Sequence, residues 1–132
     1  MKKHGILNSE ISTVLSQMGH TDQLTIGDCG LPIPDEVKRI DLALKAGKPS
    51  FIEVLSILLE DMHIEKVILA EEIKLNNKDV HRKMLDMLPD DIDIEYVSHE
   101  TFKSKTSSSK AIIRTGEITP FSNIILQSNV FF

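Results

Sequence analysis

Short strand-like segments alternate with amphipathic helices along this chain, and this alternation restricts its fold more than any other feature. Apolar residues at helical spacing, from Phe51 to Met62, predict a helix over 50–62. The continuous apolar run 66–70 then favours a strand that is buried on both faces. Strands joined in this way through helices form α/β folds. We therefore predict an α/β protein, a single domain with a largely parallel central sheet flanked by helices.

The other segments fit the same pattern. Apolar periodicity predicts a helix over 9–18 and another from Val80 to Leu88, and Ser98 can cap a short helical turn. Gly19 stands where a left-handed residue commonly ends a helix. Strands are predicted around Leu24–Ile26, Ile40–Leu44, Ile92–Tyr96 and Ala111–Arg114, with 124–132 as a candidate final strand, a shaped loop at 27–35 and a polar loop at 106–110.

Length and charge narrow the functional classes. The chain has 132 residues, which suit one domain (1–132), and we find neither a repeat nor a linker. It carries 20 acidic residues against 15 Lys and Arg, with no Trp and one Tyr, so we expect no nucleic-acid partner. No apolar run approaches the roughly 20 residues that cross a bilayer, and we see no signal peptide. We expect a soluble, cytoplasmic protein without a membrane partner.

Two features bear on redox state and association. Cys29 is the single cysteine, so no internal disulfide can form, which fits a reducing cytosol. The Asp28 carboxylate beside it would raise the pKa of a thiol, so we expect Cys29 to be a buried apolar residue. The segment 129–132 is apolar to its end, so we expect it to pack against its own sheet or another subunit.

His20 is the first candidate for chemistry, because it follows Gly19 at the predicted end of the first helix. A helix C-terminus favours a protonated imidazole, and Asp22 could add to this effect. His20 could then hold a proton near neutral pH and release it to a substrate. The alternative is that His20 only caps the helix by bonding its last carbonyl groups. Among the other histidines, we expect His4, His63 and His81 to be solvated surface residues.

Polar residues at strand ends form a second group of candidates. Asp28 and His99 each follow a predicted strand, where α/β folds place ligand-binding side chains. The alternatives are an Asx-turn for Asp28 and a first-turn helix position for His99. After the strand 111–114, a loop could present Ser122 and Asn123 to hydroxyl groups, although turn formation alone would explain its Gly and Pro. Because these polar residues all lie on loops at strand ends, we predict that they bind a small polar ligand.

Other chemistries lack their usual motifs. The sequence has no Gly-rich nucleotide or phosphate fingerprint, no His-Glu-x-x-His pair and no Gly-x-Ser-x-Gly elbow. Glu71 and Glu72 could bind a metal, but consecutive residues diverge on a helix, so a charged first turn is the simpler interpretation. We therefore predict no cofactor and no metal.

Together, these segments resemble a known family. The blocks that carry the resemblance are Met1–Asn8, Gly19–Asp22, Asp28–Pro34, Ala70–Lys74, Ser98–Glu100 and Ile113–Glu117. In this order, and over the whole length, the chain is similar to the family that contains the D-ribose pyranases and L-fucose mutarotases. The resemblance implies an enzyme that interconverts the pyranose and furanose forms of D-ribose without metal or cofactor. It also implies a homodecamer with sites between neighbouring subunits.

The resemblance also implies individual roles. His20 matches the family's proton donor, Asp28 and His99 match substrate-binding positions, and Phe121, Ser122 and Asn123 match the segment that holds the sugar. The family commonly has Tyr where this chain has Phe121. A phenolic hydroxyl is therefore missing here, while ring stacking, backbone contacts and the Asn123 amide remain.

The implied reaction agrees with the residues. Opening a cyclic hemiacetal requires a proton at the ring oxygen and removal of one from the anomeric hydroxyl, and general acid–base catalysis typically supplies about 10²–10⁴-fold. We expect His20 to be the acid, Asp28 to orient that imidazole or a sugar hydroxyl, and His99 to bind hydroxyls or return a proton. The alternatives are a sugar-binding protein without catalysis and a phosphocarrier that uses His20 as acceptor.

Overall fold

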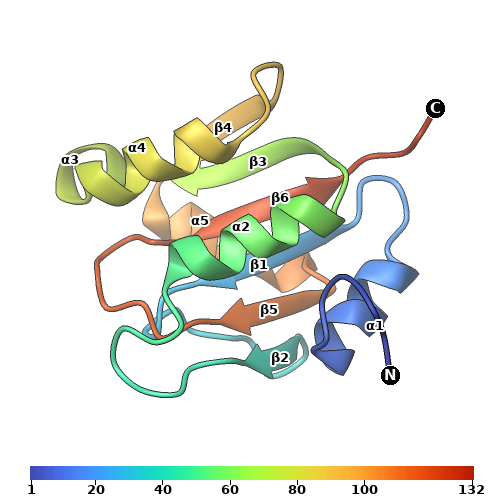
Figure 1. Ribbon diagram of the computed structural model, residues 1–132. Coiled ribbons are helices and arrows are strands. Elements are labelled where there is room, and N and C mark those ends of the chain that lie inside the picture. The colour runs from blue at the N-terminus through green and yellow to red at the C-terminus, as the bar shows by residue number, and fades with distance from the viewer.

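The computed structural model describes all 132 residues and contains one six-stranded sheet in the order β2-β5-β1-β6-β3-β4 (Figure 1). The strands are β1 (Gln23–Gly27), β2 (Lys38–Asp41), β3 (Ile64–Ala70), β4 (Asp93–Val97), β5 (Ala111–Arg114) and β6 (Ile124–Ser128). Strand β6 is antiparallel to its neighbours β1 and β3, whereas the other neighbouring pairs are parallel. The predicted α/β fold with a largely parallel sheet is thus confirmed, with one reversed strand inside it.

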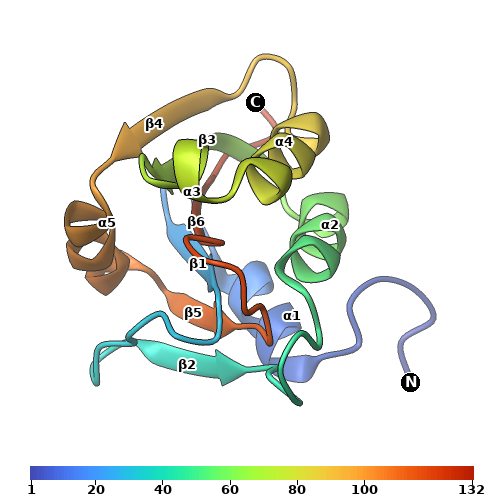
Figure 2. The same cartoon turned by 90° about the vertical axis from the view of Figure 1, so that its left-hand side faces the viewer.

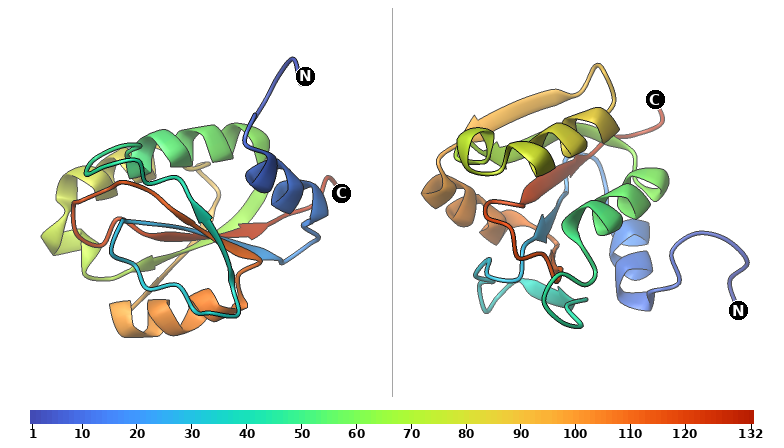
Figure 3. Two further views of the ribbon diagram at one scale, coloured as in Figure 1. Left: turned by 90° about the horizontal axis from the view of Figure 1, so that it is seen from below. Right: turned by 60° about the vertical axis from the view of Figure 1, so that its left-hand side comes forward.

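Helices cover both faces of the sheet. They are α1 (Ser9–Gln17), α2 (Phe51–Asp61), α3 (Ile73–Asn76), α4 (Lys78–Met87) and α5 (His99–Lys105), the last continuing into a 3₁₀ turn at Thr106–Ser108. Figure 2 shows α1, α2 and α4 on one side of the sheet and α5 on the other, and Figure 3 shows the same layers from two more directions. None of these helices has the length and apolar character that a membrane crossing requires.

The sheet is apolar on both faces because successive residues of its inner strands point to opposite sides. In β3, Val67 and Leu69 join the larger core under α1, α2 and α4, while Ile68 between them joins the smaller core under α5. The smaller core is centred on Phe102, which is fully buried. This two-sided burial explains why Val67–Ala70, the second half of β3, is a continuous apolar run rather than an alternating one.

Side-chain caps fix where the helices begin. Asn8 and Asn77 cap α1 and α4, and Ser98 accepts a hydrogen bond from the Thr101 N–H at the start of α5. At the start of α2, Ser50 and Glu53 bond each other's backbone N–H groups as a capping box. The predicted starts at 9, 50 and 98 therefore agree with the structure within one residue.

The end of α1 differs from the prediction. Gly19 does not adopt the left-handed conformation, which falls instead on Thr21 with φ of 68°. Two contacts hold this turn: the Asp22 carboxylate accepts the Gly19 N–H at 2.9 Å, and the Thr21 N–H donates to the Ser128 carbonyl at 3.0 Å. The chain thus turns against the end of β6 rather than closing the helix with a glycine.

Two strands also end earlier than predicted. Strand β2 ends at Asp41, and Leu44, predicted to lie in it, is 84% exposed beside the turn at 45–48. Strand β6 ends at Ser128, and Phe131 and Phe132 are 98% and 104% exposed. Phe131 and Phe132 therefore do not pack on the chain's own sheet as expected, whereas Asn129 and Val130 are half-buried and the Asn129 N–H donates to the His63 carbonyl. The packing of this segment against another subunit stays a prediction.

Two residues have other surroundings than the sequence indicated. Cys29 is half-buried rather than buried, because it lies on the loop that leaves β1. His81 is half-buried rather than solvated, and its Nε2 lies 2.7 Å from the Tyr96 hydroxyl. His63 is exposed, as predicted, and its ring stacks on Phe131 at a centroid distance of 5.7 Å.

Candidate functional site

The predicted site residues divide between two opposite ends of the sheet. We call the end at which β1, β3, β4 and β5 finish the carboxyl edge, and the end at which they start the amino edge. Asp28 follows β1, His99 follows β4, and 115–123 connects β5 to β6, so these three segments meet at the carboxyl edge. His20 precedes β1 and lies at the amino edge.

Asp28 and Asn123 form a reciprocal pair at the carboxyl edge. The Asp28 N–H donates to the Asn123 Oδ1 at 2.9 Å, and the Asn123 Nδ2 donates to the Asp28 Oδ2 at 3.1 Å. The Asp28 Oδ1 also accepts the Gly30 N–H at 2.9 Å, as the Asx-turn alternative expected. Asn123 is fully buried, so its amide fixes the carboxylate firmly while each carboxylate oxygen keeps a lone pair for a ligand.

The carboxyl of Asp28 lies in a partly desolvated position. Burial raises its pKa above the ordinary value, against the lowering effects of the Gly30 N–H, the Asn123 amide and the charge of His99. A half-buried carboxyl at a strand end, near an imidazole, is typical of residues that bind or exchange protons.

His99 lies beside this pair as the first residue of α5. Its backbone N–H donates to both oxygens of the Glu72 carboxylate, at 3.0 and 2.9 Å. Its ring meets Phe121 edge to face at a centroid distance of 5.1 Å and lies parallel to Phe102 at 6.4 Å. The imidazole Nδ1 is buried without a hydrogen-bond partner in the chain. The first-turn alternative is thus correct for the backbone, while the ring remains free for another role.

Glu72 and Glu71 serve the structure rather than a metal. Glu72 caps α5 through His99, and the Glu71 carboxylate accepts from the Lys74 ammonium at 2.9 Å. No cluster of three or more His, Cys, Asp or Glu side chains in the chain has the arrangement of a metal site.

Asn77 holds the segment 119–123 and was missed from the sequence. Its Nδ2 lies within 3.0 Å of the Thr119 hydroxyl, the Pro120 carbonyl and the Ser122 hydroxyl, while its Oδ1 accepts the Val80 N–H at the start of α4. The Ser122 side chain is fully buried within these bonds. Its hydroxyl is therefore engaged inside the chain. Beside it, Phe121 takes the left-handed conformation, with φ of 58°.

Glu117 is the second anchor of this loop. Its Oε2 accepts the Phe51 N–H at the start of α2, at 3.1 Å, and its Oε1 accepts from the N–H and hydroxyl of Thr119 at 3.1 and 2.9 Å. Burial acts to raise the pKa of Glu117, but the hydrogen bonds from Thr119, Phe51 and Ile118 outweigh it and hold that pKa below its ordinary value.

We predict that Glu117→Gln lowers the free energy of unfolding at pH 7 by about 1–3 kcal/mol, because an amide can replace only one of the two accepting oxygens. The lowered pKa means that the carboxylate stabilises the fold above roughly pH 4.3, the unfolded value, and that this contribution is lost as the pH falls through the folded value. Urea denaturation from pH 7 to pH 3 should therefore show the difference narrowing with acid. Glu60→Gln, on the exposed side of α2, is the control.

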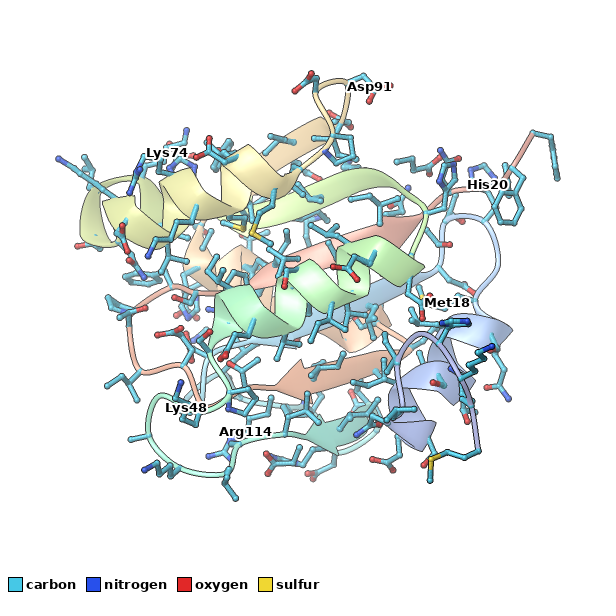
Figure 4. All side chains as sticks on the ribbon, in the orientation of Figure 1. Met18, His20, Lys48, Lys74, Asp91 and Arg114 are labelled. Atoms are coloured by element: carbon cyan, nitrogen blue, oxygen red, sulfur yellow. The ribbon has the colours of Figure 1, made fainter.

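His20 lies far from this cluster within one chain. Strand β1 separates it from Asp28, and five residues at roughly 3.3 Å each span about 16 Å. Figure 4 shows His20 at the opposite end of the sheet from Arg114, whose guanidinium donates to the Cys29 carbonyl beside Asp28. Asp28 therefore cannot orient the His20 imidazole of the same chain, as one interpretation of the sequence required.

The surroundings of His20 correct two further expectations. Its side chain bonds none of the α1 carbonyls, so it does not cap that helix. Asp22, expected to act on it, bonds the Gly19 N–H and lies 3.3 Å from the Lys110 ammonium. The partner of His20 is Glu65 on β3, with an Nε2 to Oε2 distance of 2.9 Å.

The principal clefts of the chain do not lie over the Asp28 cluster. One of about 660 Å³ lies between the N-terminal segment and α2, lined by residues such as Leu7, Ile11 and Ile57. Another, of about 640 Å³, lies beside Tyr96 and Ser98. Asp28, His99 and Asn123 line none of the five principal clefts; Asp28 and His99 are half-buried, and Asn123 is fully buried beneath them.

Comparison with known proteins gives matches over the full length. A model of the RbsD / FucU transport protein family matches residues 1–131. Curated relatives named D-ribose pyranase, from Bacillus cytotoxicus and Bacillus cereus, are 58% and 59% identical over 132 residues, with all of both chains covered.

Solved structures match as well. The Bacillus subtilis RbsD structure complexed with D-ribose superposes with a TM-score of 0.97 at 50% identity, covering all of both chains. The fucose mutarotase from Streptococcus pneumoniae, in complex with L-fucose, has a TM-score of 0.78 at 23% identity over 99% of this chain and 100% of that one. At 23% identity, this second match shows a shared fold and nothing more.

Proposed function

Because the chain belongs to the RbsD / FucU transport protein family, we propose that it is a cytoplasmic D-ribose pyranase, an isomerase that interconverts the pyranose and furanose forms of D-ribose. The observation that carries the proposal is the match to the D-ribose complex of Bacillus subtilis RbsD, which has the same fold from end to end and half of its residues identical. The relatives named D-ribose pyranase support the same activity.

The reaction needs two proton transfers. In the proposed mechanism, the His20 imidazolium donates a proton to the ring oxygen while the anomeric hydroxyl gives one up to a second carrier, for which the His99 imidazole is the candidate. The bond between C1 and the ring oxygen then breaks and the aldehyde forms. A different hydroxyl of the open chain then adds to the aldehyde, and the protons return. Because sugars already exchange ring forms slowly in water, orientation and general acid–base catalysis are enough for the enzyme.

The carboxyl edge supplies the groups that hold the sugar. The Asp28 carboxylate, fixed by Asn123 and Gly30, can accept bonds from sugar hydroxyls through its remaining lone pairs. The Phe121 ring offers an apolar surface to the sugar's C–H groups, and the His99 imidazole beside it can bond a hydroxyl or carry a proton back. The Ser122 hydroxyl is engaged in buried bonds with Asn77 and Thr119, so Ser122 shapes the loop rather than bonding the sugar.

The proposed site takes residues from two subunits. His20 of one chain stands at the amino edge, and Asp28, His99 and Asn123 stand at the carboxyl edge, so one chain cannot bring them together. A neighbouring copy that docks its amino edge on this surface would complete the site. The proposal therefore includes an assembly with sites between subunits, for which the resemblance to the family implies a homodecamer. A monomer at micromolar concentration, measured by sedimentation or light scattering, would contradict it.

The activity is tested by exchange NMR on equilibrated D-ribose, which observes ring-form interconversion directly. The native protein should raise the exchange rate above that of buffer. The family description speaks of transport, which favours a sugar carrier as the second candidate. Ribose binding without faster exchange would identify the carrier and reject the pyranase.

Phe121 allows a gain-of-function prediction. Phe121→Tyr should raise the exchange rate per site about twofold to tenfold, since the added hydroxyl can donate one more hydrogen bond, worth about 0.5–1.5 kcal/mol, to the sugar. Exchange NMR at subsaturating ribose measures the change. Equal rates for the native protein and Phe121→Tyr would show that the hydroxyl has no role.

A further inference from the structure

Glu65 connects His20 to the sheet. One carboxylate oxygen, Oε2, lies 2.9 Å from the His20 Nε2, and the other, Oε1, accepts from the Gln127 Nε2 at 2.7 Å. The Gln127 Oε1 in turn accepts from the Gln23 Nε2 at 3.0 Å. The chain of bonds therefore runs from the imidazole across β3, β6 and β1, and both oxygens of the Glu65 carboxylate have a fixed partner.

The backbone places Glu65 in an irregular position that favours this contact. Strand β3 pairs Ile64 with Ser128 and Lys66 with Gln127, so Glu65 is the extra residue of a β-bulge. A bulge changes the direction of a side chain, and bulges are frequent next to active sites. Regular pairing would give Glu65 a partner on β6 and aim its side chain by the normal alternation of the strand. The bulge instead leaves its carboxylate free to face both His20 and Gln127.

The contact is more ordered than an ordinary surface ion pair, which contributes little. Glu65 is 28% exposed at its side chain, and Gln127 and Gln23 hold it from the other side. The backbone of the His20 turn is held as well, because the Thr21 N–H donates to the Ser128 carbonyl and the Ser128 N–H donates to the Asp22 carbonyl. Both partners of the pair are thus fixed independently.

We propose that Glu65 is a positioning residue for the proton donor: it accepts the Nε2–H of His20 and leaves Nδ1 as the nitrogen that exchanges the proton with the sugar. This inference rests on the proposed function, since it assigns the geometry of that same acid. A carboxylate can only accept, so it selects the tautomer that carries its hydrogen on Nε2. Its negative charge also stabilises the imidazolium from which the proton is donated.

The ionisation of Glu65 agrees with this role. Hydrogen bonds from Gln127 and His20 hold the pKa of its carboxyl below the ordinary value, so it is charged at neutral pH. The other charged groups of this turn are already paired, since Asp22 faces Lys110. Lys66 next to Glu65 on the strand faces Glu95, at 3.0 Å.

The test is Glu65→Gln, with Glu95→Gln as the matched control on the neighbouring strand. Glu65→Gln should lower kcat for ribose exchange roughly tenfold to a hundredfold, with little change in KM. This loss is smaller than the whole contribution of the general acid, because His20 itself remains. In a His20→Ala background the same change should have no further effect, because both residues act through one proton transfer.

A spectroscopic measurement separates this inference from the proposed function. In protein labelled with ¹⁵N-histidine, the His20 imidazole should show the Nε2–H tautomer in the native and Glu95→Gln proteins, and a mixture in Glu65→Gln. This result does not depend on ribose turnover. Absence of turnover in the native protein would overturn the proposed function, and with it the role of Glu65. Native activity with an unchanged tautomer and kcat in Glu65→Gln would overturn the inference alone.

Discussion

Replacement of His20 by alanine should lower catalysed exchange of D-ribose ring forms by about 10²–10⁴-fold, the whole contribution of the general acid. The substitution removes an imidazole that is 51% exposed and packs in no core, so the fold should remain. Exchange NMR on D-ribose measures the loss. His63→Ala removes another exposed histidine from the same amino edge and should keep full activity.

The proposed site between subunits allows a stricter test of the role of His20. Asn123→Ala should also inactivate the enzyme, because it releases the Asp28 carboxylate at the carboxyl edge. When His20→Ala and Asn123→Ala subunits are unfolded together and refolded as an equal mixture, about a quarter of the sites should contain both intact halves. Activity should therefore return to about a quarter of the native value. If the mixture stays as inactive as its components, the two halves do not meet between subunits, provided that both variants assemble.

Replacement of Gly116 by alanine should destabilise the fold by about 3 kcal/mol or more, because this position has no room for a side chain. A Cβ there would overlap the Lys48 carbonyl oxygen and lie 2.5 Å from the Lys48 carbonyl carbon and 2.6 Å from the Lys45 oxygen, all backbone atoms. The Gly116 N–H also donates to the Pro49 carbonyl, and its own carbonyl accepts the Gly47 N–H. To relieve the overlap, the turn at 45–49 would have to move away from the loop that leads to Glu117, and both of these hydrogen bonds would be lost.

Thermal unfolding at one fixed protein concentration measures this effect, and the midpoint should fall by roughly 10 °C. Gly30→Ala is the matched control, since a Cβ at that exposed position would meet only the Asp28 Oδ1, at an ordinary 3.6 Å. A normal midpoint for Gly116→Ala would mean that the turn at 45–49 moves without cost, contrary to the packing described here.

The helices and most strands could be predicted from the sequence because their signals are local. The capping residues Asn8, Ser50 and Ser98 and the apolar periodicity after them need no information from distant parts of the chain. The direction of β6 is different. Its apolar residues would suit either orientation, and its place between β1 and β3 depends on pairing with strands far away in sequence. No local pattern contains that information.

The residues of the candidate site also fall into those with a local sequence signal and those without one. Asp28, His99 and Asn123 could be predicted because polar residues at strand ends are a sequence pattern, and the structure brings them to one edge. Asn77, Glu117 and Glu65 were missed because each acts through contacts 42 to 66 residues away, and an isolated Asn or Glu looks like any surface residue. The roles of His20, Asp28, His99 and the 121–123 segment remain predictions that the variants above test.

In the proposed shared site, the distance between His20 and Asp28 within one chain makes the number of complete sites depend on association. A subunit diluted away from its neighbours would hold only two separate halves, so the activity per mole of protein should fall as the total concentration drops below the dissociation constant of the assembly. Around that concentration, activity should rise more steeply than in proportion to the amount of protein. The placement of two residues at opposite ends of a five-residue strand would thus link the output of the proposed enzyme to its own abundance.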